Sequence, residues 1–138
     1  MLFKHYTLAP WDTNRWPNFT PKELSCPCCG EFYLDPTAFD TLQELRSALR
    51  KSIHLNSAHR CPFHNAHPDI GGAPFSMHKL RVAFDISVHG HLLNALLGGA
   101  RMVGFRGFGF YGTFLHVDLG KPRQWKTAGG KRTWTGLV

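Results

Sequence analysis

Two stretches of the chain carry apolar residues at helical spacing. The first predicts a helix over residues 37–51. Its apolar positions recur at intervals of three and four: Phe39, Leu42, Leu45 and Leu49. Asp35 and Pro36 precede it as an N-cap carboxylate and a proline at the first helical position. A second helix is predicted over residues 91–103, where a pair of adjacent glycines indicates close packing.

Short runs with apolar alternation predict four strands. They cover residues 53–58, 80–86, 107–111 and 113–119. The last two form a hairpin that turns near Gly112, and in the second strand Asp85 points away from the apolar face. The order helix, strand, strand, helix, strand, strand predicts an α+β domain with a small antiparallel sheet and flanking helices.

The remaining segments have little regular pattern. A length of 138 residues corresponds to a single domain over residues 1–138. Residues 1–35 contain four prolines and many turn formers, which predicts an irregular N-terminal arm. Residues 60–76 form a long loop rich in proline, glycine and histidine, and such loops in compact domains are usually functional.

Charge narrows the choice of partners. Sixteen Lys and Arg residues against nine Asp and Glu give a net charge of +7, which favours nucleic acid, anionic lipid or a bacterial wall. Residues 121–138 form a basic C-terminal tail with five cations between Lys121 and Arg132. Such a tail with tryptophans could bind phosphates, but a solvated surface is the favoured interpretation.

Composition also bears on the location of the protein. With 43% hydrophobic and 18% charged residues, the chain is not of the disordered class. Because no apolar run is long enough to cross a bilayer, we expect no membrane span. Residues 1–10 lack the apolar stretch and cleavage site of a signal peptide, so we expect cytoplasmic synthesis.

Three side chains suited to a divalent metal fall on neighbouring elements of the predicted sheet. His78 lies just before the second strand, Asp85 near its end and His116 on the last strand. Two imidazoles and one carboxylate leave a fourth tetrahedral position for water, as in catalytic zinc sites. The alternative is that the histidines are hydrogen-bonded residues of a partial core and that Asp85 caps a turn.

Several sequence motifs carry a resemblance to a known family. Residues 76–86 read S-M-H-K-L-R-V-A-F-D-I, similar to S-x-H-x-x-G-x-A-x-D-I of the zinc D-alanyl-D-alanine carboxypeptidase family. That family includes phage endolysin peptidases and is related to the vancomycin-resistance D,D-dipeptidases and the hedgehog domain. Residues 57–65 resemble its S-G-Y-R-C-P-x-H-N, and residues 114–120 its F-V-H-V-D-x-G. Shorter matches are G-G-A at 71–73, G-x-Y at 109–111 and R-x-W at 123–125.

The resemblance implies a fold like that of the hedgehog domain and the D,D-peptidases. It implies Zn²⁺ bound by His78, Asp85 and His116. It also implies that Arg60 faces the substrate, and we place Ser76 and Arg81 in the same substrate site. The Arg60 guanidinium would bind a peptide carboxylate or the oxyanion that forms on attack. Arg81 replaces the glycine of the family, so it could narrow the cleft, add an anion-binding group or mark lost activity.

Asp118 is the candidate general base. Because residues two apart on a strand share a face, Asp118 and His116 are expected to face the same site. The alternative is that Asp118 accepts the free ring N–H of His116 and orients it. The two roles are nearly equal on the sequence, with a slight preference for the base.

The four cysteines suggest a second metal site. Cys26 and Cys29 form a C-x-x-C pair, and Cys61 and His64 a C-x-x-H pair. A closed structural site of these four residues would join the arm to the loop that follows Arg60. The favoured alternative is that the cysteines are buried thiols without metal.

We therefore expect a zinc metallopeptidase that hydrolyses a peptide bond in the stem peptide of bacterial peptidoglycan. It would be a D,D-carboxypeptidase or an endopeptidase, for example a phage endolysin, and would act on the wall after release or as part of a phage particle. The alternative is a non-catalytic zinc-binding module that binds the cell wall or another partner. A nucleic-acid partner is disfavoured, because only the charge and the cysteines suggest it.

Overall fold

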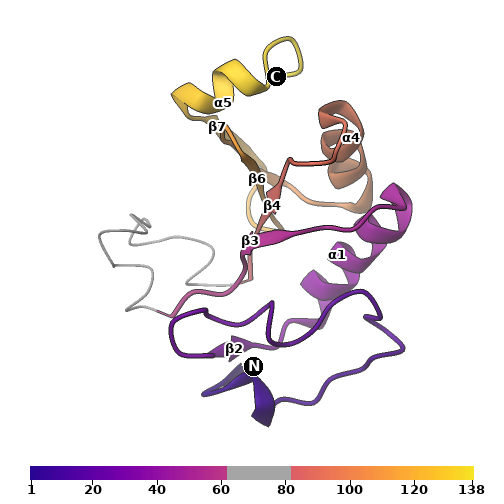
Figure 1. Ribbon diagram of the computed structural model, residues 1–138, viewed down its shortest axis with the longest axis vertical. Helices are drawn as coiled ribbons and strands as arrows, with labels where there is room; N and C mark the ends of the chain where they lie inside the picture. The colour runs from indigo at the N-terminus through magenta and orange to yellow at the C-terminus, as the bar shows by residue number, and fades with distance from the viewer. Residues whose placement is uncertain (62–81) are drawn as a thin grey trace.

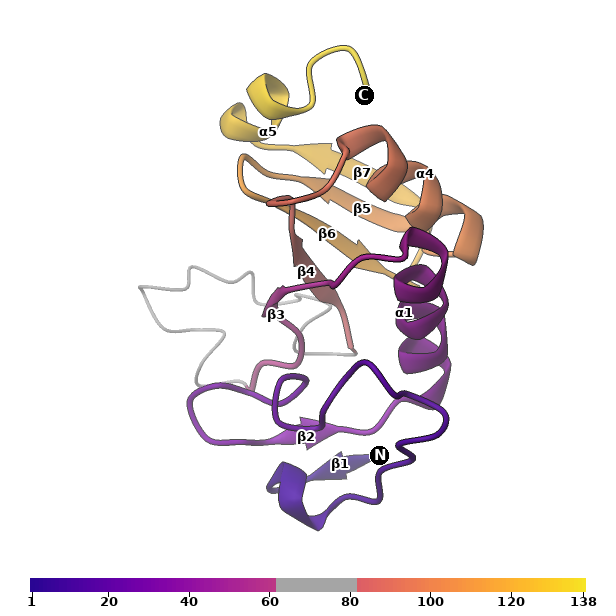
Figure 2. The same cartoon turned by 45° about the vertical axis from the view of Figure 1, so that its right-hand side comes forward.

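A five-stranded sheet forms the centre of the computed structural model, which describes residues 1–61 and 82–138. The strand order is β3-β4-β6-β5-β7, with α1 and α4 packed side by side on one face (Figures 1 and 2). The elements follow in the order β1 (Leu2–Phe3), a 3₁₀ turn (Tyr6–Leu8), β2 (Phe32–Tyr33), α1 (Pro36–Leu49), β3 (Leu55–Ser57), β4 (Phe84–Ser87), α4 (Leu93–Val103), β5 (Gly107–Phe110), β6 (Phe114–Asp118), β7 (Arg123–Lys126) and α5 (Ala128–Thr133). The predicted α+β class is confirmed.

Both predicted helices form close to their expected ends. The Asp35 carboxylate accepts a hydrogen bond from the Ala38 N–H at 3.2 Å, so it is the N-cap of α1, and Pro36 is the first helical residue. A Cβ at Gly99 of α4 would lie 3.1 Å from Leu45 Cδ1 of α1, which explains the need for a small residue there. The predicted close packing is therefore observed at Gly99, whereas a Cβ at Gly98 would meet no atom within 4 Å.

The four predicted strands form the antiparallel part of the sheet. β4 pairs with β6, and β6 pairs with β5 as the two arms of the hairpin. The strand predicted over residues 53–58 shortens to β3, and the one predicted over 80–86 is observed as β4, while residues 80 and 81 lie outside the described chain. The apolar face of these strands packs into the core with the helices: Phe84, Ile86, Phe108, Phe110, Leu115 and Val117.

The sheet is mixed, whereas the sequence predicted a small antiparallel sheet. β7 pairs with β5 in parallel register. The chain reverses after β6 and β7 lies on the far side of β5, so β7 runs in the same direction as β5. Four residues with one half-buried tryptophan are too short a pattern to predict a strand.

The basic segment 121–138 is folded rather than extended from the domain. β7 and α5 lie within it, and Trp134 is fully buried with its Nε1–H donating to the Tyr111 carbonyl at 3.0 Å. Gly130 of α5 lies directly against the Phe110 carbonyl, where no Cβ would fit. Tight docking of α5 against the end of the hairpin thus ties this segment to the core.

The N-terminal arm is irregular apart from the short β1–β2 pair and the 3₁₀ turn that follows β1. It contributes large side chains to the core, and Trp16 packs edge-on against Phe39 of α1 with ring centroids 5.4 Å apart. The arm lies at the opposite end of the molecule from α5 (Figure 2). None of the helices in the described ranges is long and apolar enough to cross a membrane.

Candidate functional site

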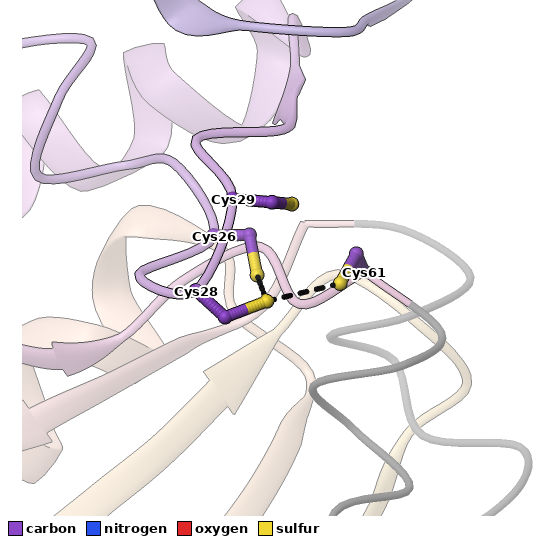
Figure 3. A group of neighbouring side chains, drawn as sticks. All are labelled: Cys26, Cys28, Cys29 and Cys61. Atoms are coloured by element: carbon purple, nitrogen blue, oxygen red, sulfur yellow. Dashed lines mark hydrogen bonds between the residues drawn. The ribbon is translucent and has the colours of Figure 1, made fainter.

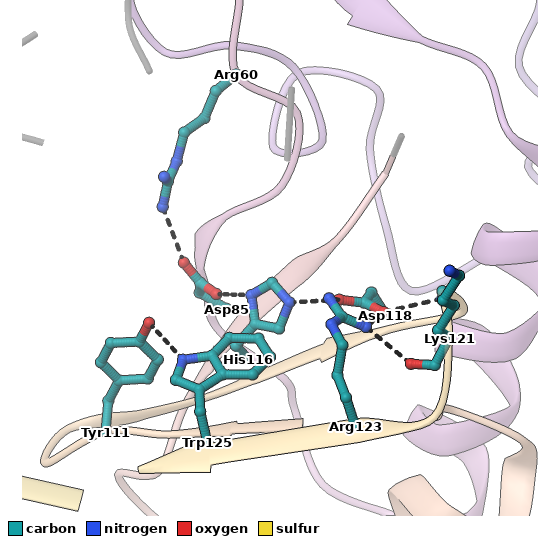
Figure 4. Close-up of polar contacts among 9 residues, drawn as sticks. Arg60, Asp85, Tyr111, His116, Asp118, Lys121, Arg123 and Trp125 are labelled. Carbon is teal, nitrogen blue, oxygen red and sulfur yellow. Dashed lines mark hydrogen bonds and ion pairs between the residues drawn. The ribbon is translucent and has the colours of Figure 1, made fainter. Parts of the chain in front are cut away.

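The face of the sheet opposite α1 and α4 carries polar side chains on three strands (Figure 4). The register aligns Asp85 of β4, His116 of β6, Gly109 of β5 and Trp125 of β7 in one row across the sheet. Since alternate strand residues share a face, this row is the reverse side of the Phe84 row. The predicted orientation of Asp85 away from the apolar side is confirmed.

His116 and Asp85 form a buried pair in the middle of this row. The Nδ1 atom of His116 lies 3.1 Å from Oδ1 of Asp85. Their exposures are only 5% and 3%, respectively. A charged carboxylate in such a position requires a positive partner, because burial removes its water.

Asp118 is hydrogen-bonded to Nε2, the second nitrogen of the His116 ring. Its Oδ2 lies 2.6 Å from His116 Nε2, which confirms that the two side chains share a face. Arg123 of β7 donates to both Asp118 oxygens at 2.9 and 2.7 Å, and the Gly120 N–H donates to Oδ1 at 2.9 Å. The carboxylate is fully buried, with both oxygens hydrogen-bonded.

These contacts shift the pKa values of both groups. Burial acts to raise the pKa of Asp118, but hydrogen bonds from His116, Arg123 and Gly120 outweigh it and hold the pKa well below its usual range. Burial acts to lower the pKa of His116, but its hydrogen bonds to Asp118 and Asp85 raise it above the ordinary value. The site therefore favours a positive charge on or beside His116.

The 3.1 Å between His116 Nδ1 and Asp85 Oδ1 suits a shared proton, and it also suits two ligand atoms of one metal ion. With Nε2–H donated to the ionised Asp118, the second nitrogen is the one that a metal would take. An imidazole nitrogen and a carboxylate oxygen are ligands typical of zinc. The donor set present among the described residues thus suits the predicted ion.

Arg60 reaches the same carboxylate from the segment that follows β3. Its guanidinium donates to Asp85 Oδ2 at 3.1 Å and, through Nε, to the Ser57 hydroxyl at 3.0 Å. Asp85 therefore presents one oxygen to Arg60 and the other to His116. Arg60, which the resemblance implies is a substrate residue, therefore lies beside the His116–Asp85 pair.

Aromatic side chains flank the pair. The Trp125 ring lies with its centroid 4.9 Å from that of His116, and its Nε1–H donates to the Tyr111 hydroxyl at 3.0 Å. Tyr111 stacks on Phe114 at a centroid distance of 4.2 Å. Together these rings form an apolar wall along one side of the site.

Of the predicted site residues, the structure brings together Arg60, Asp85, His116 and Asp118. Four further predicted residues lie outside the described residues: His64, Ser76, His78 and Arg81. The predicted cysteine ligands Cys26, Cys29 and Cys61 lie in a separate cluster. The sequence did not predict the ion pair between Arg123 and Asp118. It also did not predict that Gly107 lies against this pair, where no Cβ would fit. The R-x-W match at 123–125 and the alternation of glycine with phenylalanine in β5 were the available signals.

The four cysteines gather in a second cluster, between the arm and the segment after β3 (Figure 3). The Sγ atoms of Cys26, Cys28, Cys29 and Cys61 all lie within 4.8 Å of one another. Cys28, which the spacing argument left out, is therefore a member. Local desolvation within the cluster and the neighbouring thiols of Cys61 and Cys26 raise the pKa of the Cys28 thiol, so the thiol form is favoured without a positive partner.

A histidine nitrogen and a carboxylate oxygen are ligand types of catalytic zinc sites, and the neighbouring arginine can bind an anionic group. The chain belongs to the Peptidase M15 family, whose family model matches residues 17–118. Peptidases of this family are zinc-dependent metallopeptidases, which confirms the resemblance that the motifs carry. The matched region ends before β7, so Arg123 and Trp125 lie beyond it. Among curated proteins, no match is found.

Replacing Arg123 by methionine should destabilise the fold, because Asp118 would stay buried without its guanidinium partner. We expect a loss of about 2 kcal/mol, below the ~3–5 kcal/mol of a fully buried pair, since the Arg123 side chain is 36% exposed. Lys121→Met removes the same charge from an exposed neighbour and should change stability by less than about 0.5 kcal/mol. Equal losses in urea unfolding would show that the Arg123–Asp118 contact contributes nothing.

Proposed function

We propose that the protein is a zinc peptidase that hydrolyses a peptide bond in bacterial peptidoglycan. The observation that carries the proposal is the buried position for a positive charge between His116 Nδ1 and Asp85 Oδ1. Membership of the Peptidase M15 family supports zinc as the ion and peptidoglycan peptides as the substrate class. The finer assignment, to a D,D-carboxypeptidase or an endopeptidase of the phage endolysin type, is part of the proposal.

We assign the zinc ligands to His78, Asp85 and His116. When bound, zinc lowers the pKa of a coordinated water and polarises a carbonyl group. The protein contributes a buried, prearranged pair of ligands, because Asp118 holds His116 and Arg60 holds Asp85 by hydrogen bonds. Little rearrangement of these two ligands is then needed on binding.

Arg60 is the residue we assign to the substrate. Its side chain is mostly buried, at 14% exposure, and is held over Asp85 by Ser57. A guanidinium fixed in this way can donate to a peptide carboxylate or to the oxygen that becomes negative when the carbonyl is attacked. Ser76 and Arg81 are proposed to complete the substrate site.

Asp118 is proposed to orient His116 rather than to act as the general base. A base must have a lone pair free for the incoming proton. Each Asp118 oxygen already accepts hydrogen bonds, and the Arg123 ion pair keeps the carboxylate ionised. Its contacts therefore support the alternative to the role that the sequence slightly favoured, which makes Asp118 a positioning residue.

The structure gives little support to nucleic-acid binding by the basic segment. Arg123 is paired with Asp118, and Trp134 is fully buried. The net charge of +7 suits the anionic polymers of a bacterial wall equally well. We propose that the protein reaches the wall after release from the cell or as part of a phage particle.

The zinc-loaded protein incubated with purified peptidoglycan should release new amino groups or free D-Ala. Removal of zinc by a chelator should abolish that release, and so should alanine at His78, Asp85 or His116, because loss of one of three ligands removes most of the chelation. His89→Ala, at an exposed histidine, is the matched control and should retain both zinc and activity. Zinc binding without any release would favour the non-catalytic zinc-binding module instead.

Asp118→Asn separates the two roles of this carboxylate. If Asp118 orients His116, zinc affinity should fall by about tenfold to a hundredfold and excess zinc should restore much of the rate. The matched control is Asp40→Asn, which alters a carboxylate paired with Arg15 away from the site and should leave both quantities unchanged. A normal zinc affinity with a rate reduced by roughly a hundredfold at saturating zinc would instead make Asp118 the base.

A further inference from the structure

The cysteine cluster has the dimensions of a tetrahedral metal site. Zinc–sulfur bonds of about 2.3 Å place the sulfurs of a tetrahedral site roughly 3.8 Å apart. Here Cys26 Sγ lies 3.4 Å from Cys28 Sγ, which lies 3.3 Å from Cys61 Sγ, and all four sulfurs are within 4.8 Å of one another. The four sulfurs therefore lie close enough together for one ion to be bound among them (Figure 3).

Backbone hydrogen bonds hold Cys26, Cys28 and Cys29 in one turn. The Gly30 N–H donates to the Cys26 carbonyl at 2.8 Å, and the Cys26 N–H donates to the Glu31 carbonyl at 2.7 Å. Gly30 has a φ of +79°, a left-handed conformation that favours glycine. This conformation closes the turn directly after Cys29, so the C-x-x-C spacing of Cys26 and Cys29 is held in a fixed shape.

The fourth cysteine comes from a distant segment that is held against this turn. Cys61 lies two residues after His59, whose Nε2 lies 2.7 Å from Oε1 of Glu31, next to the turn. Cys26 and Cys61 are buried, whereas Cys28 and Cys29 are exposed, so an ion can enter from solvent. The fold thus gathers the sulfurs of two segments around one point.

We propose that Cys26, Cys28, Cys29 and Cys61 bind a structural zinc ion, separate from the peptidase centre. Each thiol releases one proton, and the four thiolates take the ion in a closed, all-sulfur site. Thiolate ligands select zinc over hard cations such as Mg²⁺ or Ca²⁺. Cys28 takes the place that the sequence assigned to His64, which lies outside the described residues.

The site would position the peptidase centre from a distance. Cys61 directly follows Arg60, whose guanidinium reaches Asp85. An ion that fixes Cys61 to the arm therefore fixes the backbone that carries Arg60. Loss of the ion should loosen this connection between the N-terminal arm and the substrate side of the site.

The test is cobalt substitution of the full chain with spectroscopy and metal analysis. Co²⁺ bound by thiolates gives an intense sulfur-to-metal charge-transfer band in the near ultraviolet, whereas a site of histidine and carboxylate ligands gives none. The band should therefore appear in the wild type and persist in His116→Ala, whatever the fate of the peptidase centre. This result separates the cysteine site from the proposed function.

Serine substitutions identify the ligands. Cys28→Ser and Cys61→Ser should each weaken the band and lower the zinc content, while Ser25→Ala, in the same turn, should leave both unchanged. An undiminished band in Cys28→Ser would overturn the all-cysteine site in favour of another fourth ligand such as His64.

The wild type also provides a test that does not depend on the folding of variants. Titration with a thiol-specific mercurial should release a zinc ion as the four thiols of the chain react. Absence of the charge-transfer band would overturn the proposal. So would native mass spectrometry that shows the cysteines as disulfides in the purified protein.

Discussion

The site depends on the absence of side chains from one face of β5. A Cβ at Gly107 would collide with Asp118 and Arg123, and one at Gly109 would lie 2.6 Å from Cζ2 of Trp125. Because these two positions are bare, side chains of β7 cross over β5 and reach β6. The Arg123–Asp118 ion pair and the Trp125–His116 contact both result from this crossing.

Because Arg123 of β7 reaches Asp118 of β6, a row of side chains with alternating charge extends across the sheet. Arg123, Asp118, His116, Asp85 and Arg60 follow one another in hydrogen-bonding contact, with positive and negative groups in turn. Each buried carboxylate is thereby held between two cationic or donor groups, which offsets the cost of its burial. The same row fixes which His116 nitrogen faces Asp85 and which faces Asp118, so the stability of the sheet and the chemistry proposed for the site depend on the same contacts.

Local patterns predicted the elements that build the core, but not the contacts made across the sheet. Apolar residues at intervals of three and four up to Leu49, with Asp35 and Pro36 at the start, were sufficient to predict α1. The alternation of apolar residues in β4 was sufficient to place Asp85 on the polar face. β7 was missed because a four-residue edge strand has too little pattern, and its parallel pairing depends on a chain reversal rather than on composition. Cys28 was missed because spacing along the chain does not show which sulfurs converge. The placement of His78, Asp85 and His116 on neighbouring elements suggested the ligand set, and the family motifs supported it with information that periodicity lacks.

The most direct test of this account is a crystal structure of the zinc-loaded protein with anomalous data at the zinc absorption edge. The account predicts a zinc peak bonded to Nδ1 of His116 and to Asp85, with Nε2 still facing Asp118 and Asp118 still held by Arg123. A peak bonded to Nε2, with the His116 ring turned away from Asp118, would contradict it. So would a zinc ion bonded directly to Asp118.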